Sequence, residues 1–222
     1  YGNGSGNNAL TKGTMNLKGN FEQLVTSSSV NSSYNFSASG THKVVLSGTG
    51  EQRISFESTN SKFNNLEYTG SSKVVLSGYF TAEKMLSDIS VTSDKVDINK
   101  IGSLNNKTFS IEGDVTVSGS IDIFGGKLKV NGELLQTGGN MYINNGSLIV
   151  NGDYRIQRRE VDTSNGTISY KYSYGCLQMT KDDDYVEVGG DFYTMSYYGN
   201  GSGNNALTKG TMNLKGNFEQ LV

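Results

Sequence analysis

A five-residue motif recurs along the chain: an apolar residue, any residue, a second apolar residue, any residue and then glycine. The alternation places two apolar side chains on one face of a short strand. Glycine then lets the backbone turn a corner. We call the glycines that end the motif the corner glycines: Gly19, Gly48, Gly78, Gly113, Gly132, Gly152, Gly190 and Gly216. Each is expected to have a positive φ or to lie where a Cβ atom would clash.

A second strand is expected directly after each corner. An acidic or amide residue often follows the glycine and an apolar residue comes next, as in Asp114–Val115 and Asp153–Tyr154. Such spacing leaves no room for the crossover helix of a βαβ unit. Repeated strand–corner–strand units predict an all-β chain, a parallel β-solenoid with coils of roughly 20–30 residues. The 38-residue spacing between Gly152 and Gly190 is expected to contain two coils.

A tandem antiparallel β-sandwich is the alternative architecture for the same short strands. Asn-Gly pairs, typical of hairpin turns, occur at 131–132, 145–146, 151–152 and 165–166. Two of them end the five-residue motif and precede a strand, which suits a solenoid corner equally well. The absence of proline favours the solenoid, because its inner strands must donate amides to their neighbours. The best helix candidate, residues 81–87, is two turns at most.

An internal identity sets a longer repeat. Residues 1–25 and 198–222 have the same sequence, which gives a repeat length of 197 residues. One interpretation is a tandem array, in which residues 1–222 form a single continuous solenoid window spanning one unit and the first 25 residues of the next. The other is an engineered copy that caps or joins the ends. In an array, we expect the two copies to occupy equivalent places.

Composition excludes several classes of protein. The chain has 19 basic and 21 acidic residues, so its charge of −2 excludes nucleic-acid binding by bulk electrostatics. A single cysteine and a single histidine exclude a disulfide framework and a zinc centre built from those residues. No apolar run approaches the ~18 residues of a membrane helix, so we expect no membrane span in this window.

Charged residues offer two weak candidate sites. Asp182, Asp183 and Asp184 could bind calcium through oxygen ligands. Their spacing matches neither the EF-hand loop nor the Gly-Gly-x-Gly-x-Asp calcium repeat, and a solvated acidic turn is the simpler interpretation. Arg158 or Arg159 could face these aspartates in a carbohydrate-active site, with an ordinary charged loop as the simpler interpretation. We therefore expect no catalytic residue and no cofactor.

Tyrosines are concentrated late in the chain. Tyr170, Tyr172 and Tyr174 alternate and are expected on one face of a strand. There they could form an interaction face for sugar rings or for another fibre, or be buried as an aromatic ladder between coils. His42 and Cys176 are expected to be structural, with Cys176 as a cross-link between fibres the alternative.

The stretch 42–117 carries a G-x-G-x-Q-x-I-x-F segment, followed by F-N-N-L and V-x-L. The matching residues are Gly48, Gly50, Gln52, Ile54, Phe56, Phe63, Asn64, Asn65, Leu66, Val74 and Leu76. This pattern resembles the β-helical repeat segments of very large bacterial cell-surface and secreted adhesin-like proteins. The resemblance implies a right-handed solenoid, an extracellular or cell-surface location, a scaffold or adhesive role, and no catalytic residue.

Together these features predict a structural protein, the shaft of an extracellular bacterial fibre or surface stalk. Its expected partner is a further copy of itself, joined end to end along the solenoid axis, with polysaccharide or other fibres as further partners. The alternative is a carbohydrate-binding or carbohydrate-active β-helix, similar in kind to polysaccharide lyases and hydrolases. That alternative requires converging carboxylates or arginines and an aromatic face.

Overall fold

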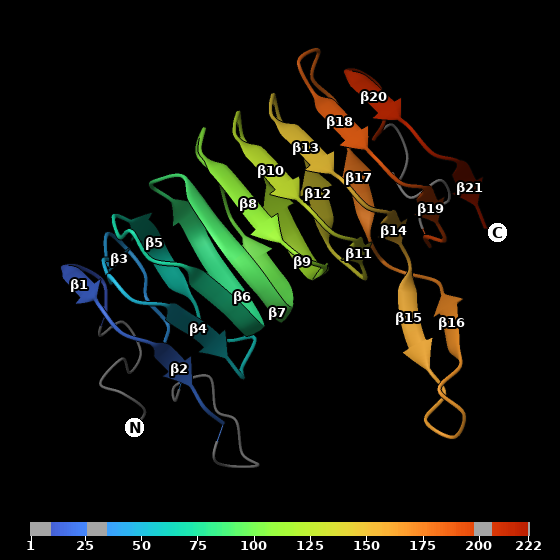
Figure 1. Cartoon of the computed structure of the whole chain (residues 1–222). Helices are drawn as coiled ribbons and strands as arrows, with labels where there is room; N and C mark the ends of the chain where they lie inside the picture. Colours follow the sequence, from blue (N-terminus) through green and yellow to red (C-terminus); the bar gives the residue numbers. More distant parts are fainter. Residues whose placement is uncertain (1–9, 26–34, 198–205, 222) are drawn as a thin grey trace.

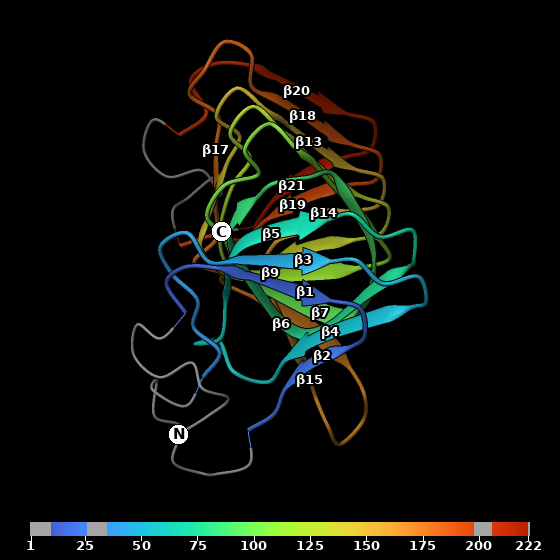
Figure 2. The ribbon, with the colours of Figure 1, turned by 90° about the vertical axis from the view of Figure 1, so that its left-hand side faces the viewer.

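The chain is all-β, and most of its strands form one parallel sheet that is nearly closed around an apolar interior, as in a β-solenoid. A computed structural model describes residues 10–25, 35–197 and 206–221 (Figure 1). Within these ranges, nineteen strands join in the sheet, and two more form a separate hairpin. Figure 2, which looks from the β1 end, shows the strands wrapping around the interior. Among the described residues, no helix has the length and apolar character needed to cross a membrane.

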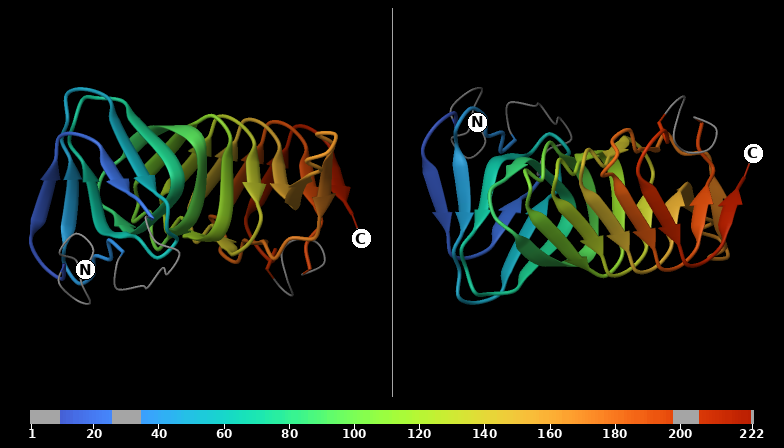
Figure 3. Two further views of the ribbon diagram at one scale, coloured as in Figure 1. Left: turned by 90° about the horizontal axis from the view of Figure 1, so that it is seen from below. Right: turned by 90° about the horizontal axis from the view of Figure 1, so that it is seen from above.

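The sheet consists of three rows of strands, which run side by side along the solenoid (Figure 3). Row A contains β2 (Phe21–Gln23), β4 (Gln52–Phe56), the first parts of β6 (Val74–Met85) and β7 (Ile89–Ile101), β8 (Thr108–Glu112), β10 (Lys127–Val130), β13 (Ser147–Val150), β18 (Tyr185–Val188) and β20 (Thr211–Leu214). Row B contains the middle parts of β6 and β7, the first part of β9 (Val115–Asp122), β11 (Leu134–Gln136), β14 (Tyr154–Ile156), β19 (Phe192–Thr194) and β21 (Phe218–Gln220). Row C contains β1 (Thr14–Leu17), β3 (Lys43–Leu46), β5 (Phe63–Tyr68), the last parts of β6, β7 and β9, β12 (Asn140–Tyr142) and β17 (Cys176–Gln178).

The apolar residues of the five-residue motif stack in register inside the sheet. In row A, Ile111 lies opposite Val130, Val130 opposite Val150, and Val150 opposite Val188. All four side chains are buried. Burying one such side chain contributes about 1.5–3 kcal/mol. A shift of one residue would turn every apolar side chain of a strand to the solvent, so this pattern fixes the register.

The sandwich alternative is not what the chain forms, because every pairing within the 19-stranded sheet is parallel. Three of the four Asn-Gly pairs lie at bends between consecutive strands of the sheet, at residues 131–132, 145–146 and 151–152. The fourth, at 165–166, lies between β15 (Arg158–Val161) and β16 (Ile168–Lys171), the one antiparallel pair among the described residues. Gly166 has a φ of 72° there, as a hairpin turn requires.

The prediction of two coils between Gly152 and Gly190 is wrong. β13 pairs directly with β18, and β14 pairs directly with β19, so one circuit of the chain fills this interval. The additional residues form the β15–β16 hairpin, which projects from the body of the solenoid (Figure 1). Its strand residues are largely exposed to solvent.

The best helix candidate, residues 81–87, is not helical, because residues 81–85 belong to β6. Ala82 lies opposite Phe63 of β5 on one side and opposite Ile101 of β7 on the other. The segment is rich in good helix formers, but pairing on both sides outweighs a propensity of a few tenths of a kcal/mol per residue.

Both copies of the 25-residue segment form a strand, a bend and a second strand. The first copy gives β1 and β2, and the second gives β20 and β21, at the opposite end of the solenoid (Figure 3). Their rows differ: β1 and β2 lie in rows C and A, whereas β20 and β21 lie in rows A and B. The segment is therefore displaced by one row around the axis after 197 residues.

Candidate functional site

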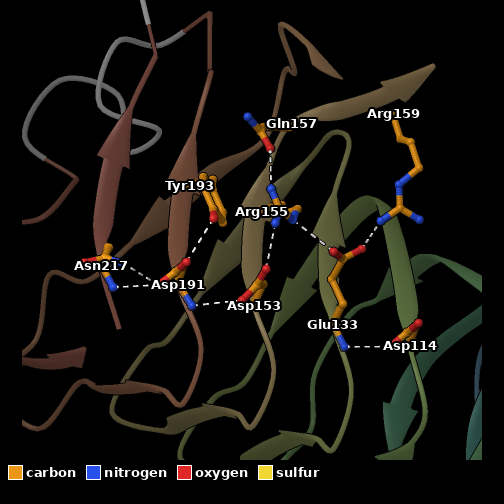
Figure 4. Close-up of polar contacts among 9 residues, drawn as sticks. All are labelled: Asp114, Glu133, Asp153, Arg155, Gln157, Arg159, Asp191, Tyr193 and Asn217. Carbon is orange, nitrogen blue, oxygen red and sulfur yellow. Dashed lines mark hydrogen bonds and ion pairs between the residues drawn. The ribbon is translucent and has the colours of Figure 1, made fainter. Parts of the chain in front are cut away.

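The polar residues that follow the corner glycines form a ladder of hydrogen bonds between successive coils. We call this set the corner ladder: Asn20, Asp114, Glu133, Asp153, Asp191 and Asn217. The backbone N–H of Glu133 donates to Asp114 Oδ1 at 2.8 Å. The N–H of Asp191 donates to Asp153 Oδ1 at 2.9 Å, and that of Asn217 donates to Asp191 Oδ1 at 2.7 Å (Figure 4). Backbone donors at the bends are thereby satisfied by the preceding coil.

Arg155 joins three coils at this corner (Figure 4). Its Nε lies 2.9 Å from Glu133 Oε2 of the preceding coil, and its Nη2 lies 2.6 Å from Asp153 Oδ2 of its own coil. Its Cζ lies 3.8 Å from the ring centroid of Tyr193 on the following coil. The planar guanidinium can make these contacts simultaneously, which the ammonium of lysine cannot.

The charges of the corner are balanced by these contacts. The N–H of Asn217 and the hydroxyl of Tyr193 donate to the carboxylate of Asp191 and lower its pKa. Burial disfavours the charged form of Arg155, but hydrogen bonds to Asp153 and Glu133 and the nearby Tyr170 outweigh it and raise the pKa of the guanidinium. Both groups are therefore charged over the physiological range, which suits a permanent structural bridge.

Arg155 also contacts the projecting hairpin. Its Cζ lies 4.9 Å from the ring centroid of Tyr170 on β16. Arg159 on β15 pairs with Glu133, which thus binds two arginines, and its Cζ lies 5.9 Å from the same Tyr170 ring. These contacts attach the base of the hairpin to the body of the solenoid.

The three alternating tyrosines do not lie along one strand, because β16 ends at Lys171. Tyr170 faces the arginines, whereas Tyr172 and Tyr174 contact Tyr197, at ring-centroid distances of 5.9 and 5.2 Å. We call Tyr172, Tyr174 and Tyr197 the exposed tyrosine cluster, because these residues are 44, 61 and 68% accessible to solvent. The predicted face is therefore divided between a structural contact and an exposed surface.

The aspartates proposed for calcium have different roles. Asp184 is buried, and its Oδ2 accepts hydrogen bonds from the N–H groups of Thr180 and Lys181 at 2.7 and 2.9 Å. Its Oδ1 accepts from the N–H of Asn145 at 2.6 Å. Asp182 is exposed and pairs with Lys209. Within the described ranges, no group of three or more His, Cys, Asp or Glu side chains is placed to hold a metal ion.

The predicted alignment of arginines with these aspartates does not form either. Arg159 pairs with Glu133, and Arg158 pairs with Glu160 of its own strand. Each arginine is thus paired with a nearby carboxylate and neither pairs with Asp182, Asp183 or Asp184.

Most corner glycines lie where a neighbouring coil comes close. A Cβ atom on Gly152 would lie 2.7 Å from the carbonyl oxygen of Gly132, so a side chain there would push two coils apart. Gly78 has a φ of 63°, and a Cβ atom there would lie 2.5 Å from the carbonyl oxygen of Phe56. The crowded positions are Gly48, Gly78, Gly132, Gly152, Gly190 and Gly216, and Gly113 has a positive φ. Gly19 departs from the expectation, because its Cβ position faces open space before the first coil.

A buried polar cluster was not anticipated from the sequence. The hydroxyl of Tyr154 donates to Gln136 Oε1 at 2.5 Å, and Gln136 Nε2 donates to the carbonyl oxygen of Gly139 at 2.9 Å. Both side chains are fully buried. The signal in the sequence is Gln136 itself, a polar residue two positions after Leu134 and therefore on the inward face of the strand. Burial also raises the pKa of the Cys176 thiol beside this cluster, which opposes the cross-linking interpretation.

Comparisons with known proteins add no relative. No protein-family model matches the chain, and no curated protein or solved structure matches it significantly.

Proposed function

We propose that this chain is structural: a right-handed β-solenoid with coils of roughly 20–30 residues that forms the shaft of an extracellular bacterial fibre or surface stalk. The observation that carries the proposal is the place of the duplicated segment. The same strand pair begins the sheet as β1–β2 and continues it as β20–β21, with β3–β4 following the first copy and β18–β19 preceding the second. A further 197-residue unit could therefore be added without any new kind of contact.

The extracellular location and the bacterial source are part of the proposal and rest on the resemblance of residues 42–117 to adhesin-like repeats. The corner ladder supports a structural role. Its carboxylates accept backbone N–H groups of the next coil, so they are occupied in holding coils together. Arg155 adds a bridge across three coils.

The length added by one unit follows from the strand pairings. Eight successive pairings in row A separate β2 from β20. Parallel strands lie about 4.8 Å apart, so one unit should advance the shaft by roughly 40 Å.

Small-angle X-ray scattering on chains of one, two and three 197-residue units tests the proposal. The maximum dimension should rise by roughly 40 Å for each unit, while the cross-sectional radius of gyration stays constant. A cross-section that grows with unit number would mean that the units pack side by side, and the shaft function would be wrong.

Carbohydrate binding is the second candidate, and the exposed tyrosine cluster is the observation that favours it. Aromatic rings can stack on sugar rings. The rings of Tyr174 and Tyr197 stack on one another at an interplanar angle of 18°, and both residues are largely exposed to solvent. Affinity electrophoresis through gels containing neutral or acidic polysaccharides tests this candidate. Retardation that Tyr174→Ala and Tyr197→Ala abolish would support it, and equal mobility in all gels would exclude it.

A further inference from the structure

The exposed tyrosine cluster brings together two consecutive circuits of the chain. Ser173 and Ser196 are bridge partners in parallel pairing, and both are buried. Because side chains alternate along an extended backbone, the residues beside these serines, Tyr172, Tyr174 and Tyr197, lie on the outer face. Further circuits along the axis would flank outward side chains rather than cover them. The outward position of the cluster therefore follows from the alternation.

Tyr174 and Tyr197 are the closest pair of the cluster. Each follows a bridged serine by one residue, so their backbones lie side by side, about 4.8 Å apart as in any parallel sheet. The N–H of Tyr197 donates to the carbonyl oxygen of Ser173 at 2.9 Å, which supports this register. The ring centroids are 5.2 Å apart at an interplanar angle of 18°. The fold thus holds two phenol rings in contact across neighbouring circuits.

The phenolic hydroxyls of this pair differ from those of other tyrosines. Tyr185 and Tyr193 donate their hydroxyl hydrogens to the carboxylates of Glu187 and Asp191. Neither hydroxyl of the stacked pair has such an acceptor among the described residues, and both residues are largely exposed. Their hydroxyls are therefore open to an oxidant from solvent that removes a hydrogen atom.

We propose that Tyr174 and Tyr197 are a modification site, at which hydrogen peroxide acting through a peroxidase joins the two rings as dityrosine. Each phenol loses one hydrogen atom from its hydroxyl, and the two radicals form a carbon–carbon bond between ring positions ortho to the hydroxyls. The ring hydrogens at these positions move to the oxygens and restore both phenols. The two hydrogen atoms that were removed reduce one hydrogen peroxide to two water molecules.

The new bond would join two consecutive circuits covalently. Residues 174 and 197 are 23 positions apart, so the bond closes a loop that contains β17, β18 and β19. A closed loop lowers the conformational entropy of the unfolded chain, as a disulfide does. The single cysteine, Cys176, leaves the chain without an internal disulfide. The tyrosine pair offers a covalent staple in its place, whether or not the chain forms a shaft.

A haem peroxidase with hydrogen peroxide tests the site on the folded chain. Wild type should gain dityrosine fluorescence, with a yield per chain that does not depend on protein concentration, because the reaction is intramolecular. Tyr174→Phe and Tyr197→Phe keep the rings but lack one phenol, and each should lose most of the fluorescence. Tyr142→Phe, at an exposed position outside the cluster, is the matched control and should keep it.

Peptide mapping places the bond. Trypsin cleaves after Lys181 in the unfolded product, so the expected species is peptide 172–181 joined to peptide 182–209, with two hydrogen atoms fewer than the separate peptides. Fragment ions should assign the bond to Tyr174 and Tyr197. The Tm of the cross-linked wild type should rise by about 5 °C, a shift absent from treated Tyr197→Phe.

Four outcomes would overturn the staple. They are a bond at other tyrosines, fluorescence in Tyr197→Phe equal to that of wild type, cross-linked dimers whose yield rises with protein concentration in place of the internal product, and an unchanged Tm of the cross-linked chain. None of them bears on the dimensions of chains of one, two and three units, so the staple and the shaft function fail separately.

Discussion

The guanidinium of Arg155 lies over the ring of Tyr193 on the following coil, 3.8 Å from its centroid, while it also pairs with Glu133 on the preceding coil. We expect Arg155→Ala to lower the free energy of unfolding by roughly 2–3 kcal/mol, because it leaves partly buried carboxylates without their partner. Urea denaturation measures this. Arg158→Ala is the matched control: its exposed pair with Glu160 should be worth less than about 1 kcal/mol. Equal losses in the two variants would contradict the bridging role.

The close approach of coils at Gly152 gives a second prediction. Gly152→Ala should cost roughly 1–3 kcal/mol, because the new methyl group would meet the carbonyl oxygen of Gly132. Gly19→Ala is the control, since its Cβ position is open. Thermal melts of both variants suffice, and a Gly152→Ala protein with the wild-type Tm would show that the corner tolerates a side chain.

His42 makes stability depend on pH. The side chain is buried, its Nδ1 has no hydrogen-bond partner among the described residues, and burial lowers its pKa. The unfolded chain therefore takes up a proton first as the pH falls, so stability is complete above the unfolded pKa of about 6.5 and declines below it. His42→Gln should lose less stability than wild type between pH 7.5 and pH 5.5. If wild type and His42→Gln lost the same free energy of unfolding between these two pH values, this role for His42 would be disproved.

Asp184 should be structural rather than a calcium ligand. Asp184→Asn should destabilise the chain by roughly 1–3 kcal/mol, because a carboxylate that accepts three backbone N–H groups is replaced by a single acceptor oxygen. Asp183→Asn, at an exposed position, should have little effect. Calcium and EDTA should leave the Tm unchanged. A calcium-dependent rise in Tm that Asp184→Asn abolishes would restore the metal interpretation.

Strands, parallel pairing and the apolar interior could be predicted because each depends on a local pattern. The motif that ends at Gly132 carries both the alternation and the bend that the structure displays. The hairpin was missed because residues 158–171 lack that motif and the 38-residue spacing fits two coils as well as one. Its turn signal, Asn165-Gly166, was visible but had three equivalents at bends of the sheet.

The site depended on contacts that no local pattern specifies. Arg155, Tyr193 and Tyr170 are brought together by the stacking of coils and by the folding back of the hairpin. The row shift between the two copies of the repeat was equally hidden, because two identical segments carry no information about the row in which each lies. Which strands become neighbours depends on the number of residues between motifs and on where an insertion such as the β15–β16 hairpin interrupts the sheet.

The central claim is that successive units continue one rigid solenoid, and a distance between units tests it most directly. In a chain of two units, Cys176→Ala removes the native thiol and Lys127→Cys places a spin label at an exposed position of each unit. Double electron–electron resonance then measures the distance between the two labels. The account predicts a single narrow distribution at or somewhat above roughly 40 Å, because eight pairings separate β2 from β20 along the axis and the row shift adds a sideways displacement. A broad distribution, or a narrow one far from that value, would mean that the units are separate bodies or pack side by side, and would contradict the shaft.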